Sequence, residues 1–259
     1  MSKFPDDKLL LVEIPYVSIQ GEGKYVGHPM MFIRLQGCPV GCVWCDSYYT
    51  WPPFNIDKVP EGIKVPDPQV WTFKQLKEHI DKLNPAHVWF TGGEPTMQSE
   101  ALTNYLKEYY DQARDFHICT AGWIWNRALF ERIDSITVDI KPPSSQTKSV
   151  LKVVDQLMEE FGDKVELKMV VANTDEDREY AMMISNKYDI IDLTFQPLYI
   201  SEPELQKSIT LTNEVDVSLM NWNLADFADW VTNTFKSNIF VRMGLQLHKH
   251  LYPERMRGI

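Results

Sequence analysis

Three cysteines, Cys38, Cys42 and Cys45, lie close together in the string GCPVGCVWCD. A structural zinc site normally has four protein ligands, so three thiols fit it poorly. They fit better an iron–sulfur cubane that keeps one iron open to another molecule, and such an iron can support chemistry. Two alternatives remain, a zinc knuckle completed by a distant histidine and buried thiols that only pack.

Two further segments carry residue types that suit ligand binding. In Thr91-Gly92-Gly93-Glu94-Pro95 the glycines allow a ligand to approach the backbone, and Glu94 can accept hydrogen bonds from an ammonium group, although the segment could also be an ordinary turn. In Ser18-Ile19-Gln20-Gly21-Glu22-Gly23, exposed backbone groups between Gln20 and Glu22 suit a heterocycle with its own donors and acceptors.

Two single residues also stand out. Arg34 interrupts the apolar run 30–35, where it could clamp a carboxylate or form a structural salt bridge. Trp44, directly before the last clustered cysteine, could pack on a planar ligand or act as a hydrophobic lid over the cysteines.

These segments must be positioned by regular secondary structure. The chain alternates β-rich apolar runs with helical patterns, which predicts an α/β fold with a parallel sheet. The sheet could be doubly wound or curled toward a barrel. Ligands gather at the carboxyl ends of such strands, where both the cysteines and the Gly-Gly-Glu turn fall. The predicted strands are 10–19, 30–35, 87–91, 115–120, 135–140, 165–171, 190–195 and 238–244. The predicted helices are 72–83, 100–112, 127–133, 147–161, 176–187 and 224–235.

Composition and the placement of prolines indicate how the chain is organised. Five prolines in 51–70 and an irregular stretch at 197–223 predict long insertions in one domain spanning 1–259. A net charge of −10 argues against broad binding to nucleic acid. The chain shows neither a signal peptide nor an apolar run long enough to cross a membrane, so we expect a cytoplasmic protein.

Taken together, the motifs resemble a known family. The cysteine spacing C-x3-C-x2-C followed by GGEP is the signature of radical S-adenosylmethionine (SAM) enzymes. With SIQGEG, F-x-R, TGGEP, DIKPPSS and the final LQLHKHLYPERMRGI, the chain resembles the 7-carboxy-7-deazaguanine synthase family (QueE) from residue 13 onward. The resemblance implies an incomplete, modified TIM-like barrel of the radical SAM type.

The family resemblance also implies a reaction, the conversion of 6-carboxy-5,6,7,8-tetrahydropterin to 7-carboxy-7-deazaguanine with loss of ammonia, toward queuosine-type 7-deazapurines. A 4Fe–4S cluster, SAM and Mg²⁺ would serve as cofactors, and a 5′-deoxyadenosyl radical would take hydrogen from C6 of the pterin. The implied partners are a reductant protein such as flavodoxin and a second copy in a homodimer.

The resemblance assigns roles to individual residues. Cys38, Cys42 and Cys45 would bind the cluster and Ser47 would bind Mg²⁺, while a turn or N-cap role for Ser47 is the alternative. Glu22 and Arg34 would be catalytic, and the substrate contacts would be Ile19, Gln20, Gly21, Glu22, Arg34, Thr91, His248 and Ile259. Cofactor contacts would be Trp44, Cys45, Asp46, Gly93, Glu94, Asp139, Ile140, Lys141 and Gln196.

Some positions depart from the family pattern and some interpretations compete. Asp139 replaces a serine of the family, and the segment from Cys119 to Trp123 lacks its usual glutamate, so we expect Cys119 to be a small buried strand residue. His248 could be a packed surface histidine and Ile259 a frayed end. The competing functions are another radical SAM enzyme, such as a glycyl-radical activase, and a non-catalytic zinc-binding or electron-transfer protein.

Overall fold

The computed structural model describes residues 4–59, 65–147, 149–200 and 220–251. Within these ranges ten strands form one sheet in the order β10-β9-β8-β7-β6-β5-β3-β1-β4, with β2 paired beside β3. The strands are β1 Lys8–Leu11, β2 Tyr16–Ile19, β3 Pro29–Leu35, β4 Gln69–Thr72, β5 His87–Gly92, β6 Asp115–Thr120, β7 Ser135–Ile140, β8 Val165–Val171, β9 Leu193–Pro197 and β10 Val241–Met243. Neighbours from β3 to β10 are parallel, as the alternating pattern predicts.

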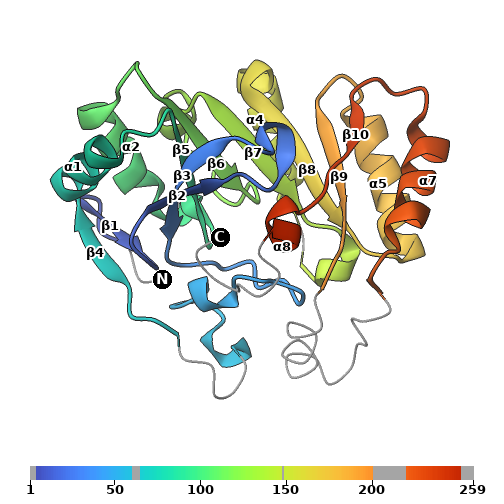
Figure 1. Cartoon of the computed structure of the whole chain (residues 1–259), viewed down its shortest axis with the longest axis horizontal. Coiled ribbons are helices and arrows are strands. Elements are labelled where there is room, and N and C mark those ends of the chain that lie inside the picture. Colours follow the sequence, from blue (N-terminus) through green and yellow to red (C-terminus); the bar gives the residue numbers. More distant parts are fainter. Residues whose placement is uncertain (1–3, 60–64, 148, 201–219, 252–259) are drawn as a thin grey trace.

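Helices cover the outer face of this sheet (Figure 1). They are α1 Phe73–Leu83, α2 Ser99–Tyr109, α3 Arg127–Phe130, α4 Leu151–Phe161, α5 Asp175–Lys187 and α7 Leu224–Phe235, and α8 Leu247–Leu251 lies on the other side. Short 3₁₀ helices are η1 Gly23–Tyr25, η2 Tyr48–Thr50, η3 Ile56–Lys58, η4 Pro95–Gln98, η5 Pro143–Ser145 and η6 Gly162–Lys164. A capping box starts α1, because the side chains of Thr72 and Gln75 bond reciprocally with the backbone there.

Strand alternation separates an apolar layer from a functional layer. In β5, Val88 and Phe90 belong to the large core shared with the helices, which also contains Leu102 and Tyr105 of α2. Trp89 and Thr91 instead line a cavity on the inner face. Successive residues of a strand point to opposite faces, so one strand supplies both the core and the cavity.

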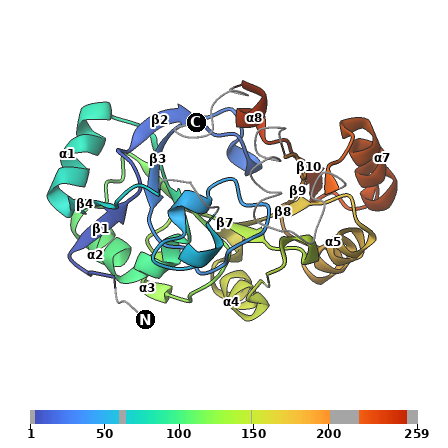
Figure 2. The same ribbon diagram turned by 90° about the horizontal axis from the view of Figure 1, so that it is seen from below.

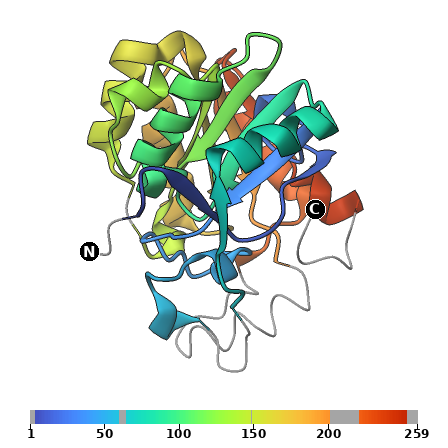
Figure 3. The ribbon, with the colours of Figure 1, turned by 90° about the vertical axis from the view of Figure 1, so that its left-hand side faces the viewer.

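The sheet is not closed, since β4 and β10 end the strand order. Seen from below, the strands follow an arc with most helices along its outer side (Figure 2). This confirms the predicted α/β fold with an incomplete barrel. The light-blue segment that carries the cysteines lies at one end of the sheet (Figure 3).

One predicted strand, 10–19, is wrong as a single element. It divides into β1 and β2, both antiparallel to β3. Pro15 has no N–H to donate to a ladder, and the chain leaves the sheet between the two strands. The break matters for the site, because it brings Glu13 to 2.9 Å from Arg34.

Where the structure describes it, the insertion predicted at 51–70 is irregular apart from the short 3₁₀ helix η3, Ile56–Lys58, and its last two residues, Gln69 and Val70, which begin β4. That strand lies at the end of the sheet order, where a proline-rich approach is tolerated. Most of the second insertion, residues 201–219, lies outside the described residues.

Candidate active site at the carboxyl end of the sheet

A cavity of about 240 Å³ lies at the carboxyl ends of the parallel strands. Its lining residues are separated by up to 230 positions in the sequence, from Ile19 to Lys249. The predicted site residues that line it are Ile19, Gln20, Gly21, Glu22, Arg34, Cys38, Cys42, Cys45, Asp46, Ser47, Thr91, Gly93, Glu94, Asp139 and Lys141. The loops that follow β2, β3 and β5 thus converge on one space.

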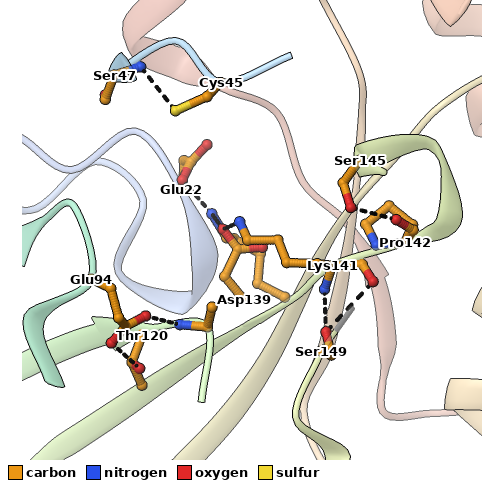
Figure 4. A network of polar contacts seen from close by, with 12 residues as sticks. Glu22, Cys45, Ser47, Glu94, Thr120, Asp139, Lys141, Pro142, Ser145 and Ser149 are labelled. Atoms are coloured by element: carbon orange, nitrogen blue, oxygen red, sulfur yellow. Dashed lines mark hydrogen bonds and ion pairs between the residues drawn. The ribbon is translucent and has the colours of Figure 1, made fainter. Parts of the chain in front are cut away.

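The loop with the three cysteines starts where β3 ends, and its first residues are hydrogen-bonded to Thr50 and Trp51, which follow the cysteines in the chain. The amide of Gly37 donates to the carbonyl of Thr50 at 2.7 Å, and the amide of Cys38 donates to that of Trp51 at 3.1 Å. Within the loop, the Ser47 amide lies 3.4 Å from Cys45 Sγ (Figure 4). The backbone therefore fixes the loop independently of any bound group.

The Gly-Gly-Glu turn after β5 packs directly on the cysteine loop. The amide of Glu94 donates to the carbonyl of Gly37 at 2.8 Å, and a Cβ on Gly93 would lie 2.4 Å from that same carbonyl oxygen. No side chain fits at such a distance, so position 93 requires glycine. The two motifs noticed separately in the sequence form one packed unit.

Glu94 is almost fully buried and accepts four hydrogen bonds. Its Oε1 accepts from the amide and hydroxyl of Thr96. The same oxygen accepts from Thr120 Oγ1, and Oε2 accepts from the amide of Ala121; the contact with Thr120 is drawn in Figure 4. The carboxylate therefore ties the end of β5 to the end of β6. This structural role accompanies its position on the cavity wall.

The three cysteine thiols suit an iron–sulfur cluster. All three line the same cavity, and no disulfide joins them. Burial raises the pKa of each thiol, and the pKa of Cys38 reaches about 12. Thiolates are the ligands of such clusters, so iron must displace these protons when it binds. The residues present fit a cluster held by three thiolates.

Four charged side chains form a network beside the cysteines (Figure 4). Lys168 Nζ lies 2.6 Å from Glu22 Oε2 and 3.1 Å from Asp139 Oδ2, and Lys141 Nζ lies 2.9 Å from the same Asp139 oxygen. Burial works against the charged form of Lys168, but the carboxylates of Asp139 and Glu22 outweigh it and raise the lysine pKa well above its usual range. Two ammonium groups thus balance two carboxylates.

One oxygen of the Asp139 carboxylate makes no hydrogen bond within the described residues. Its Oδ1 is buried and has no hydrogen-bond partner among the described residues. A buried acceptor without a donor costs roughly 1–3 kcal/mol. An ammonium or hydroxyl group of a bound molecule would remove this cost, which favours the predicted cofactor role of Asp139.

The loop after β2 is anchored at both of its ends. Gln20 exchanges backbone hydrogen bonds with Gly27 and His28, each 2.8 Å long. From the far end of the chain, Leu247 donates its amide to the Gly21 carbonyl at 2.9 Å, and Gln246 Nε2 donates to Glu22 Oε1 at 2.8 Å. The sequence segment predicted to contact a heterocycle is therefore held in place over the cavity.

Arg34 forms a structural salt bridge, one of its two predicted interpretations, and it also lines the cavity. Its Nε donates to Glu13 at 2.9 Å and its guanidinium lies 3.4 Å from the Tyr16 hydroxyl, while the residue lines the cavity. The salt bridge fixes the guanidinium in position, and a fixed planar donor group is well suited to bind a carboxylate.

Several predicted residues do not line the cavity. Trp44 donates to Ser144 Oγ at 3.2 Å and packs with the small cluster around Val170. Ile140 is fully buried in the large core, and Gln196 is fully buried and bonds the Leu245 carbonyl. The side chain of His248 and all of Ile259 lie outside the described residues.

The cavity also contains residues that sequence reasoning missed. They include Lys168, Trp89, Tyr49 and Lys249. Cys119, expected only to be small and buried on its strand, lines the cavity as well, and burial raises its pKa to about 12. A signal for Lys168 existed, because a lysine in the otherwise buried strand Val165–Val171 needs a partner just as Arg34 does.

The chain is similar to known proteins in sequence and in fold. Residues 32–161 match the Radical SAM superfamily. A protein of Bacillus cereus named 7-carboxy-7-deazaguanine synthase is 33% identical over 234 residues, covering 89% of this chain and 87% of the relative. A protein of the same name from Thermoplasma acidophilum is 32% identical, covering 75% and 85%.

The chain belongs to the 7-carboxy-7-deazaguanine synthase family. Among solved structures, QueE from Escherichia coli shares the fold with a TM-score of 0.59 at 20% identity, covering 93% of this chain and 95% of that one. Streptococcus suis SuiB bound to the precursor peptide SuiA has a TM-score of 0.55 at 15% identity, covering 86% of this chain and 50% of that one.

Membership in this family settles several expectations. The protein is a radical SAM lyase, which uses a 4Fe–4S cluster and SAM, and the activase alternative is not favoured. In the part of the chain that the structure describes, no helix is both long enough and apolar enough to cross a membrane.

Proposed function

We propose that this family member converts 6-carboxy-5,6,7,8-tetrahydropterin to 7-carboxy-7-deazaguanine with loss of ammonia, in 7-deazapurine biosynthesis. The observation that carries the proposal is the convergence of the anchored loop 19–22, Arg34 and the three cysteines on one cavity. A polar loop, a fixed cation and a thiol cluster are the groups that a pterin carboxylate and a radical cofactor require.

The roles proposed for individual residues come from the family resemblance, and the positions of the side chains support some of them. Cys38, Cys42 and Cys45 would hold the cluster, and cluster and SAM together supply the radical chemistry when bound. The methionine end of SAM would lie along Gly93, Glu94 and Asp46, which line the cavity, whereas the predicted cofactor residues Trp44, Ile140 and Gln196 do not line it and would support its wall. Asp139, paired with Lys141 and Lys168, would accept from the cofactor with its Oδ1, which has no partner among the described residues.

The substrate would lie on the opposite side of the cavity. Arg34 would bind the pterin carboxylate, and Ile19, Gln20 and Gly21 would contact the ring edge, with Thr91 at the end of the sheet. Glu22, held by Lys168 and Gln246, would face the reacting ring as an oriented acceptor. His248 and the carboxylate of Ile259 would complete the substrate contacts.

The experiment that tests this function is anaerobic incubation of cluster-loaded enzyme with reductant, SAM and the carboxytetrahydropterin. Mass spectrometry should find the product that has lost ammonia. Absence of this product from a protein with full cluster content would refute the proposal.

A magnesium ion beside the cluster is the finer part of the proposal. Ser47 Oγ lies 2.9 Å from Asp46 Oδ1, at the mouth of the cysteine loop. A hydroxyl and a carboxylate are hard oxygen donors of the kind that Mg²⁺ accepts, so Ser47 and Asp46 would hold the ion, which would supply positive charge for the substrate carboxylate.

We expect Ser47→Ala to lower activity and to weaken its response to added Mg²⁺, because the variant lacks one oxygen donor. Ser47→Thr retains the hydroxyl and should keep the response. The measurement is initial rate against Mg²⁺ concentration, with iron content checked in each protein. An unchanged magnesium dependence in the alanine variant would remove Ser47 from the site.

Other parts of the proposal concern the whole protein. We propose a single domain over residues 1–259 that acts in the cytoplasm as a homodimer. Its electrons would come from a reductant protein such as flavodoxin. Sedimentation of the purified enzyme tests the dimer, and turnover with reduced flavodoxin in place of a chemical reductant tests the donor.

A further inference from the structure

Two histidines and an aspartate meet at the amino ends of β5 and β6, at the opposite end of these strands from the active site. His87 Nδ1 lies 3.1 Å from His117 Nε2 and 3.3 Å from Asp115 Oδ2. The possible ligand atoms of the three side chains all lie within 4.8 Å of one another. Neither the cysteine motif nor the family's reaction accounts for this group.

The spacing matches a metal site. Zinc–nitrogen and zinc–oxygen bonds of about 2.0–2.1 Å at tetrahedral angles place neighbouring ligand atoms about 3.3 Å apart. The two distances from His87 Nδ1 fit that value. The adjacent strands fix it, because His87 and Asp115 are paired residues in the parallel register of β5 and β6.

Hydrogen bonding alone satisfies this group poorly. His87 Nδ1 faces both a carboxylate oxygen and an imidazole nitrogen, and one proton on it can be given fully to only one of them. His117 is fully buried, and its other nitrogen, Nδ1, has no partner among the described residues. Placing the ring proton on that Nδ1 leaves the Nε2 lone pair directed at His87 and Asp115.

We propose that His87, Asp115 and His117 form a binding site for a borderline divalent cation of the zinc class. Two imidazoles and a carboxylate are a donor set that such ions prefer over Mg²⁺ or Ca²⁺. The Asp115 side chain is 59% exposed, which gives the ion an entry path from solvent. Water or the nearby His28, whose ring centroid lies 5.6 Å from that of His87, would complete four-fold coordination.

The bound ion would act on the stability of the barrel. It would clamp the starts of two neighbouring strands and immobilise His117, on which Trp89 stacks with ring centroids 5.6 Å apart. Trp89 in turn lines the active-site cavity. The site thus lies one layer of side chains beneath the cavity, and it is independent of the reaction proposed above.

Crystals of the cluster-loaded enzyme grown with Zn²⁺ test the site directly. Loading the cluster first occupies the three cysteines, which would otherwise bind zinc themselves. Anomalous difference maps above and below the zinc absorption edge distinguish zinc from iron. We expect one zinc peak between His87, Asp115 and His117; a map with no zinc peak there would overturn the proposal.

Calorimetric titration of the same enzyme with Zn²⁺ adds a test in solution. His87→Ala and Asp115→Asn should weaken binding at least tenfold, whereas His250→Ala, which removes an exposed histidine outside the group, should bind like wild type. Replacement of the fully buried His117 is avoided because it would risk the fold. Zn²⁺ should also raise the Tm of wild type and not that of His87→Ala. Equal zinc affinity in His87→Ala and wild type would refute the site.

Discussion

A Cys42→Ser variant is expected to fold but to lose its iron–sulfur cluster and all product formation. Cys42 lines the cavity together with Cys38 and Cys45, and two thiolates cannot hold a cluster that needs three protein ligands. The measurements are iron and sulfide content, visible absorbance after anaerobic reconstitution, and product by mass spectrometry.

Cys119→Ser is the matched control. Cys119 lines the same cavity, and its pKa is raised by burial just as that of Cys42 is, but it lies on β6 outside the cysteine loop. This variant should retain full iron content. The assignment of the cluster ligands fails if Cys119→Ser loses iron as completely as Cys42→Ser, or if Cys42→Ser keeps a full cluster.

Lys168→Met is expected to be the most destabilising single change in the charged network. Methionine fills most of the same space but leaves the carboxylates of Glu22 and Asp139 in a buried site without the ammonium between them. Breaking a buried pair in this way costs about 3–5 kcal/mol. For a chain of this size we expect Tm to fall by roughly 6–15 °C, and activity to fall because Glu22 loses its position.

The control for this change is Lys74→Met, in which the lysine belongs to a well-exposed pair with Glu78 at 3.8 Å. Such surface pairs contribute about 0–1 kcal/mol, so its Tm should stay close to that of wild type. Thermal unfolding of both cluster-loaded variants under anaerobic conditions provides the comparison. Equal melting temperatures for the two variants would show that the network does not stabilise the fold.

The pH dependence of this effect has a definite sign. The pKa of Lys168 is raised in the folded protein, so its stabilising contribution is fully present below the ordinary lysine pKa of about 10.4 and is lost only as the pH rises through the higher folded value. The difference in Tm between Lys168→Met and wild type should therefore stay constant from about pH 6 to pH 9.

The sequence was sufficient for the parts of the fold that depend on local pattern. The parallel order from β3 to β9 follows from strands that alternate with amphipathic helices, and α1, Phe73–Leu83, starts within one residue of the predicted helix 72–83. The division between β1 and β2 was missed although Pro15 signalled it, because the apolar residues on both sides read as one run.

The candidate site was predictable where residues are close in sequence, and less so where distant strands supply them. The cysteine spacing predicted one cluster of thiols, and the three residues do line one cavity. Nothing local in the sequence pairs Lys168 with Glu22, which precedes it by 146 positions. That contact exists only because β8 brings its inner face beneath the loop after β2, and sheet topology is a global property.

A second long-range contact, in which Gln246 and Leu247 bind the loop after β2, affects how the protein is made. The cysteines emerge from the ribosome early, whereas Gln246 and Leu247, which hold Glu22 and Gly21, follow Cys45 by about 200 residues. At typical rates of synthesis this is an interval of roughly 10–40 s. During that time the nascent chain carries reactive thiols in an unfinished cavity. We therefore expect the cluster to be inserted after the chain is released. Until then, chaperones or the reducing environment must protect these thiols.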